Sequence, residues 1–271
     1  MGDSLVHEEA GELGTVGQLG AAAIDLLIGG RELYSVFVRS LYYTFRGRRD
    51  KGAVMQQMYE IGNKSVFFIS ITMGFIGMIL VYQAGLQAKR VVPDYTMLGA
   101  TYLELLVRDF AASIGALMLA TRVGAGIAAE IGSMVVTEQI DALRMCAADP
   151  IDFLIVPRFL ASITMTLMLI VWGGTVAFTA GAFTAYFAFD VPLQTFFNMA
   201  LVDVGDLTVG LAKCFAYGAA IPIVSGYCGL STFGGSEGVG WATTRAVVNS
   251  SLAIIILNFF ISGAAFLVFP G

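Results

Sequence analysis

The chain has 271 residues, of which 57% are hydrophobic and only 13% are charged, whereas about 25% of the residues in an ordinary soluble domain are charged. This composition excludes an ordinary soluble domain and is typical of a membrane protein. The formal net charge of −5 argues against a nucleic-acid partner.

The residues before the first apolar run form a tail and an interfacial region. Residues 1–12 carry acids where a secretory signal would carry bases, and they lack an apolar core. We therefore predict a flexible acidic tail and not a signal peptide. In the next region, residues 13–61, charges recur every six or seven residues along a helical pattern up to about residue 45. This pattern predicts one or two amphipathic helices lying in the membrane interface.

Five segments beyond residue 62 are apolar enough to cross a hydrocarbon core, which requires about 20 residues of helix. The first contains 24 residues without a charge, and the run 159–189 contains 31. The predicted spans are approximately 65–88, 102–122, 157–189, 207–233 and 246–269. The fold class is therefore predicted to be an all-α integral membrane protein with five transmembrane helices, preceded by an N-terminal interfacial amphipathic helix.

The second span is unusual because its charge-free run, 110–121, has only 12 residues. A crossing helix must therefore include Glu104, Arg108 and Asp109. Glu104 and Arg108 are i,i+4 neighbours that can pair along the helix, with Asp109 beside them. Ionisable groups inside a membrane cost at least about 2.5–3.5 kcal/mol each near its centre. This cluster either snorkels to water at the outer interface or forms a polar site that faces a cavity.

The longest polar interlude between two apolar segments covers residues 120–158. Its polar residues are spaced by three or four positions, so they share one face of a predicted helix over about 126–146. They are Glu130, Ser133, Thr137, Asp141 and Arg144. Such a helix either docks a soluble subunit through its polar face or simply connects two spans.

The distribution of basic residues predicts the orientation. With the N-terminus in the cytoplasm, eleven Lys or Arg residues fall in cytoplasmic segments, and only Lys89 and Arg90 fall outside. Cytoplasmic loops of membrane proteins carry such an excess. The segment 126–146 is therefore predicted to be cytoplasmic and the C-terminus to lie on the other side of the membrane. Lys213, near the start of the fourth span, is predicted to snorkel to the interface.

Common catalytic and nucleotide-binding motifs are absent from the sequence. No GxxxxGK[ST] phosphate loop, HExxH or GxSxG occurs, and His7 in the tail is the only histidine. The chain therefore offers no usual nucleotide cradle and no histidine chemistry within the membrane. Any motion driven by ATP has to come from another chain.

The run RVGAGIAAEIGSMVVTEQIDALRMCAADPIDFLIVPRFLA resembles the signature block of the MlaE/YrbE permeases. The stretches LLVRDFAASIGALMLATR and ATTRAVVNSSLA resemble the second-span motif and the final cytoplasmic turn of the same family. Asp109 stands where the family commonly has Glu, and Ala111 and Ala112 replace its Gly-Pro. By this resemblance residues 62–271 would form an MlaE-type permease domain.

The resemblance implies the membrane subunit of an ABC lipid transporter in the inner membrane. Its expected partners are a second copy of the chain, a cytoplasmic ABC ATPase that holds ATP and Mg, MCE-domain subunits and a STAS-domain regulator. This chain itself would bind no cofactor and would have no catalytic site. The expected cargo is phospholipids or related lipids moved between inner and outer membranes.

The resemblance also assigns roles to residues. Segment 126–146 would be the coupling helix, touching the ATPase through Glu130, Thr137, Glu138, Asp141 and Arg144. Glu104, Arg108 and Asp109 would lie at the lipid pocket, flanked by Tyr82 and Gln83. Apart from Arg122, which ends the predicted second span, Arg108 is its only cation and would meet an anionic headgroup. The alternative is a self-sufficient channel or ion-coupled carrier that uses Glu104, Arg108 and Asp109 as a relay.

Overall fold

The computed structural model describes residues 15–46, 51–91, 97–198 and 200–268, and within them it contains helices and no strand. The helices are α2 (Thr15–Arg46), α3 (Lys51–Val91), α4 (Leu98–Leu105), α5 (Ala111–Leu119), α6 (Ala125–Val136), α7 (Gln139–Met145), α8 (Val156–Phe189), α9 (Leu193–Phe196), α10 (Val204–Leu230) and α11 (Gly235–Val268). Three π-helical turns connect some of them: η1 (Leu106–Phe110), η2 (Ala120–Gly124) and η3 (Ile151–Ile155).

Five helical rods are long and apolar enough to cross a membrane, which confirms the predicted fold class. They are Lys51–Arg90, Leu98–Val136, Ile151–Phe189, Val204–Leu230 and Gly235–Val268. Most are longer than predicted because a charge-free run marks only the part of a helix inside the hydrocarbon. The helical hydrogen-bond pattern continues into charged flanking residues.

The first span illustrates this difference. It begins at Lys51 and not at residue 65, so residues 51–61, which we assigned to the interfacial region, form the first turns of α3. Glu60 and Lys64 form an i,i+4 ion pair on this extension, an arrangement that stabilises exposed helical turns. The predicted tail, residues 1–12, lies outside the described residues.

The predicted helix over 126–146 is wrong as a single element. Its first half, α6, continues the second span without a break through η1, α5 and η2. The chain then turns at Glu138, which has a left-handed backbone with φ of 59°, and the short helix α7 follows. Ile127, Ala128 and Ile131 are buried against the neighbouring helices α10 and α11, so α6 belongs to the bundle.

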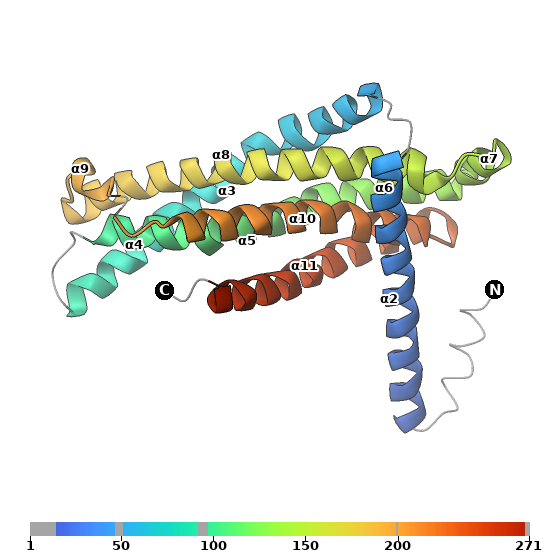
Figure 1. Cartoon of the computed structure of the whole chain (residues 1–271), viewed down its shortest axis with the longest axis horizontal. Coiled ribbons are helices and arrows are strands. Elements are labelled where there is room, and N and C mark those ends of the chain that lie inside the picture. Colours follow the sequence, from blue (N-terminus) through green and yellow to red (C-terminus); the bar gives the residue numbers. More distant parts are fainter. Residues whose placement is uncertain (1–14, 47–50, 92–96, 199, 269–271) are drawn as a thin grey trace.

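Helix α2 lies crosswise to the bundle, near the end that carries α6 and α7, whereas α4 and α9 lie at the opposite end (Figure 1). It is one uninterrupted helix, and Gly29 and Gly30 do not break it. Two side-chain hydrogen bonds attach it to the bundle. Tyr43 donates to Asp149 Oδ2 at 2.9 Å, and Tyr227 of α10 donates to Glu32 Oε2 at 2.9 Å. This arrangement fits a helix lying along a membrane surface.

Close helix contacts in the bundle depend on small residues. Helix α3 packs along α8, and a Cβ atom on Gly77 would lie 2.2 Å from the carbonyl oxygen of Ala177. A Cβ atom on Gly210 of α10 would likewise lie 2.4 Å from the carbonyl oxygen of Val107 in η1. Small residues allow such backbone approach between membrane helices. The second contact brings α10 against the charged turn of the second span.

Candidate functional site

Arg108 and Asp109 lie on the π-helical turn η1, in the first third of the helical rod Leu98–Val136 that forms the second span. A π-helical turn inserts an extra residue into an α-helix and is frequent at functional sites. Both side chains are half-buried. Each is paired with a residue of α10, so the charges of the second span face the fourth span.

The Arg108 guanidinium lies 3.2 Å from Asp206 Oδ1. Asp206 is buried and also accepts a hydrogen bond from the backbone N–H of Asp203, which caps the start of α10. The Asp206 carboxylate therefore completes the capping box of α10 and also neutralises Arg108 of the second span. This double role fixes the register between the two helices.

Lys213 lies seven residues after Asp206 on α10 and pairs with Asp109, with 2.7 Å between Nζ and Oδ1. The lysine side chain is only 1% exposed, whereas the Asp109 side chain is 42% exposed. Asp109 Oδ1 also accepts a hydrogen bond from Ser113 at 3.0 Å. We call Arg108, Asp109, Asp206 and Lys213 the intramembrane charge cluster.

A second polar contact joins α10 to the fifth span. Tyr217, four residues after Lys213 and fully buried, donates a hydrogen bond to Asn258 Oδ1 of α11 at 3.1 Å. Ser262 donates to the same oxygen at 3.3 Å. Polar side chains inside a bilayer bond to one another across helices, because water is absent. The polar residues therefore link the second, fourth and fifth spans.

Two expectations about this cluster are wrong. Arg108 pairs with Asp206, across the helix interface, and not with Glu104 on its own helix. Lys213 does not snorkel to the interface but is buried against Asp109. Asp206 and Lys213 are seven residues apart and so lie on one helical face. This spacing, set beside the adjacent charges Arg108 and Asp109, is the sequence signal that could have revealed both pairs.

Tyr82 and Gln83, the other predicted lipid contacts, lie on α3. The Tyr82 ring packs against Phe189 of α8, with 5.9 Å between ring centroids, and Gln83 is exposed. Within the described residues, no hydrogen bond or ion pair joins either side chain to Glu104, Arg108 or Asp109. The structure therefore does not bring the five predicted residues together, and their role in lipid binding stays a prediction.

An apolar groove of about 410 Å³ lies next to the charge cluster, between the second span, α8 and α10. Leu106 and Val107 of η1 and Gly210 and Cys214 of α10 line it, together with Phe178 of α8. These residues alternate along the chain with those of the charge cluster. One helical seam thus presents paired charges and an apolar hollow at the same level of the bundle.

The predicted coupling residues fall into two groups. Thr137, Glu138, Asp141 and Arg144 are all exposed, on the turn after α6 and on α7. Asp141 and Arg144 pair with each other at 3.2 Å, and this pair is largely solvated. Glu130 lies apart from them on α6, where it pairs with Arg158 of α8 at 2.8 Å.

The segment after α7 is attached to α2. Asp149 accepts the hydrogen bond from Tyr43, and through Oδ1 it also accepts one from the backbone N–H of Ile151, at 3.0 Å. The hydrogen bond to Asp149 raises the pKa of the Tyr43 phenol, because the bond stabilises its protonated form. In the described residues no group of His, Cys, Asp and Glu side chains is arranged to hold a metal ion.

Five apolar rods, a crosswise surface helix and charges paired within the bundle define a polytopic membrane protein. Residues 54–264 match the family described as Permease MlaE. A probable ABC transporter permease protein of Synechocystis sp. is 36% identical over 83% of this chain and 86% of its own. One of Rickettsia typhi is 35% identical over 79% and 83%, respectively.

A plant protein is also similar. The chloroplastic protein Trigalactosyldiacylglycerol 1 of Arabidopsis thaliana is 32% identical over 78% of this chain and 61% of its own length. The match to the family model covers more than half of the chain, and the bacterial relatives match over most of their own length. The chain therefore belongs to the MlaE family of ABC transporter permeases.

Removal of Asp109 should destabilise the protein more than removal of Lys213. Asp109→Ala leaves an ammonium unpaired in a site that excludes solvent, at a cost of about 3–5 kcal/mol. Lys213→Met leaves a carboxylate that is 42% exposed at the surface of the bundle and still accepts the hydrogen bond from Ser113, and it adds an apolar side chain of similar length. Thermal unfolding of both variants in the same detergent measures the order, and equal or reversed stabilities would contradict the burial of Lys213.

Proposed function

We propose that this permease moves phospholipids or related lipids between inner and outer membranes, driven by ATP hydrolysis on a separate subunit. The match of residues 54–264 to the MlaE family carries the proposal. The Arabidopsis relative is named after a glycerolipid, which is consistent with a lipid cargo. ATP and Mg are assigned to the partner ATPase, and no nucleotide or catalytic site is assigned to this chain.

The intramembrane charge cluster and the adjacent groove supply the chemistry that such a cargo needs. A guanidinium forms two parallel hydrogen bonds with a phosphate, and Arg108, one-third exposed, retains free donors beyond its bond to Asp206. The apolar groove beside it suits an acyl chain. In this proposal Arg108 binds the phosphate with these free donors and keeps its bond to Asp206, while Lys213 keeps Asp109 neutralised.

We assign the contact with the ATPase to α7 and the preceding turn. Thr137, Glu138, Asp141 and Arg144 are exposed there, on a short helix that projects from one end of the bundle (Figure 1). Glu130 is left out of this surface in the proposal because its exposed carboxylate pairs with the buried Arg158 of α8. Glu138, whose backbone is left-handed, turns the chain between α6 and α7 and so separates this surface from the second span.

The remaining partners follow from the exposed apolar surface and the family. Helix α11 is the least buried of the five spans, and Leu252, Ile255, Ile256 and Phe259 are each more than half exposed. Such a surface is consistent with a second copy of the chain packing along α11 in a homodimer. MCE-domain subunits on the outer side and a STAS-domain subunit on the cytoplasmic side complete the proposed assembly, without a nucleic acid.

The proposed location is the inner membrane, with the N-terminus and α7 in the cytoplasm and the C-terminus in the periplasm. The excess of Lys and Arg in the segments at the α7 end supports this orientation. Residues 235–268 form one continuous helix, α11, which starts at the α7 end of the bundle and runs toward the opposite end (Figure 1).

The double variant Glu138→Lys, Asp141→Lys is expected to abolish copurification with the ATPase, because it reverses the charge of the proposed contact. Gln194→Lys adds a positive charge at the opposite end of the bundle and serves as the control. Pull-down of the coexpressed ATPase through a tag on this chain measures the effect. Undiminished copurification of the double variant would remove α7 from the interface.

Replacement of Arg108 should reduce bound phospholipid by about tenfold, the effect expected when one charge-assisted contact is lost. The variant combines Arg108→Ala with Asp206→Asn, so that no buried carboxylate is left unpaired. Arg108→Lys, which keeps the charge but lacks the planar fork, should lie between it and the parent protein. Native mass spectrometry counts the lipids, and unchanged occupancy would contradict a headgroup site at Arg108.

Labelling of cysteines from one side of the membrane tests the orientation. Cys146, which is exposed at the end of α7, should react with an impermeant maleimide only after the membrane is opened, while the buried Cys214 and Cys228 stay unreactive. A cysteine introduced at Lys89, in a background without Cys146, should react in intact cells. The reverse pattern would invert the proposed topology.

A further inference from the structure

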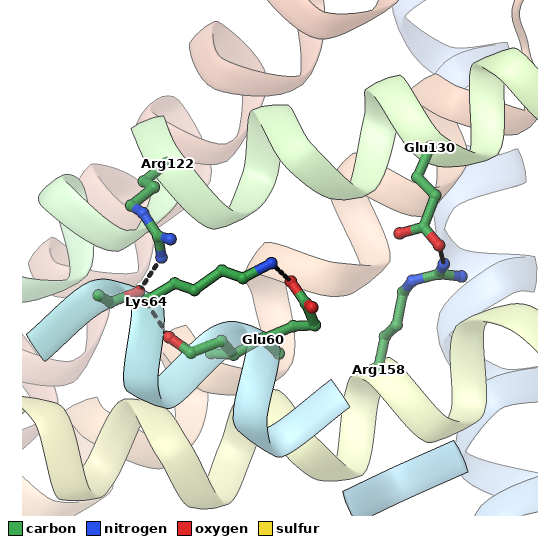
Figure 2. A network of polar contacts seen from close by, with 7 residues as sticks. Glu60, Lys64, Arg122, Glu130 and Arg158 are labelled. Atoms are coloured by element: carbon green, nitrogen blue, oxygen red, sulfur yellow. Dashed lines mark hydrogen bonds and ion pairs between the residues drawn. The ribbon is translucent and has the colours of Figure 1, made fainter. Parts of the chain in front are cut away.

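A second polar site lies far from the charge cluster, in a cleft of about 400 Å³ between α3 and the end of the second span. The polar side chains that line it come from both walls: Gln56, Gln57 and Glu60 from α3, and Arg122 and Glu130 from η2 and α6. Figure 2 shows Arg122 reaching toward α3 and Glu130 facing Arg158 of α8. Neither the predicted lipid contacts nor the proposed ATPase surface accounts for this cleft.

Arg122 is the feature of the cleft that needs explanation. Arg108, Lys213 and Arg158 each lie within 4.0 Å of a carboxylate, as does Lys64 on α3. Arg122 is half-buried like Arg108, yet the one partner described for it is the hydroxyl oxygen of Ser65, to which it donates. No carboxylate among the described residues pairs with it. A guanidinium has five N–H donors, so most of them are free for an anion.

The depth of Arg122 suits a lipid headgroup. It follows Arg108 by fourteen residues on one helical rod, which places it about 21 Å further along the axis. The hydrocarbon core is about 30 Å thick. Arg122 is also the first charged residue after the charge-free run 110–121, so it lies near the edge of the core at the α7 end. Tyr59, 60% exposed on the neighbouring part of α3, is of a residue type enriched at that level of the membrane.

The other side chains of the cleft add negative charge and an apolar floor. Glu60 and Glu130 line it, and the ion pairs with Lys64 and Arg158 each use one carboxylate oxygen. Ile61 and Ile127 are buried at its base. The cleft can therefore pair an anion with Arg122 and a cation with the two carboxylates, while Ile61 and Ile127 contact the apolar part of the same ligand.

We propose that this cleft binds the headgroup of a zwitterionic phospholipid, with its phosphate on Arg122 and its ammonium group toward Glu60 and Glu130. The lipid comes from the leaflet at the α7 end, which the proposed orientation makes the cytoplasmic leaflet. It is a site separate from the charge cluster, and it does not depend on whether the chain transports lipid. The lipid supplies the counter-ion that the described residues do not provide for Arg122.

Photocrosslinking of the full-length chain in detergent tests the site directly. The probe is a phosphatidylethanolamine that carries a diazirine on an acyl carbon close to the glycerol. Equal amounts of a phosphatidylglycerol probe and a diacylglycerol probe with the same diazirine serve for comparison. Peptide mass spectrometry should find the label in residues 51–65 and 120–130. It should be strongest with phosphatidylethanolamine and weakest with diacylglycerol, which lacks the phosphate.

Two kinds of variant separate the site from the fold. Arg122→Gln should reduce labelling of these peptides about tenfold, and Arg39→Gln removes an exposed cation of α2 as its control. Gly126→Leu should also block labelling. A Cβ atom at Gly126 meets no atom within 4 Å, so the leucine fills the cleft without a clash and leaves Arg122 in place. Gly30→Leu, at an equally open glycine of α2, is its control.

Retained labelling in both Arg122→Gln and Gly126→Leu would overturn the proposal. So would a phosphatidylglycerol signal equal to that of phosphatidylethanolamine, because the two carboxylates would then play no part. Competition by an equal concentration of soluble phosphorylethanolamine would contradict a lipid occupant. Loss of labelling when the partner subunits are added would also overturn it, because a protein side chain would then fill the cleft in the complex.

Discussion

A charge inside a hydrocarbon core has to meet an opposite charge, and this constraint organises the bundle. Arg108 and Asp109 are consecutive residues, and each is neutralised by a residue of α10. The two partners, Asp206 and Lys213, lie two helical turns apart. The π-helical turn η1 carries the consecutive pair, and Gly210 lies between the two partners, where α10 approaches the backbone of Val107. The buried cation Lys213 has no access to water and depends entirely on this arrangement.

The same helical rod connects two regions of different character. It runs from Leu98 to Val136, through the charge cluster and past Arg122. The chain then turns at Glu138, whose backbone is left-handed. The proposed ATPase surface therefore lies at one end of a helical rod whose other half carries the proposed lipid contact. The ion pair between Glu130 and Arg158 links the α6 end of this rod to α8. The hydrogen bond from Tyr43 to Asp149 links α2 to the segment after α7. A displacement of α7 would have to move or break these named contacts to reach the charge cluster.

The five spans and the polar second span could be predicted from the sequence, because the length of a charge-free run reflects the thickness of the hydrocarbon. Helix ends could not, since helices such as α3 continue into charged turns outside that layer. The partners of Arg108 and Asp109 depend on which helices become neighbours, and sequence spacing along one helix favoured Glu104 instead. The break at Glu138 was missed because a non-glycine residue adopts a left-handed backbone there. The roles of the predicted site residues are not decided by the fold.

We propose that this permease uses the charge cluster to move phospholipid with energy from a separate ATPase. The most direct measurement reconstitutes the chain with its ATPase and MCE-domain subunits in proteoliposomes and follows a fluorescent phospholipid between donor and acceptor vesicles. The account predicts transfer that requires ATP and falls strongly when Arg108 and Asp206 are replaced together. Transfer that proceeds equally without ATP, or that is unaffected by this replacement, would contradict it.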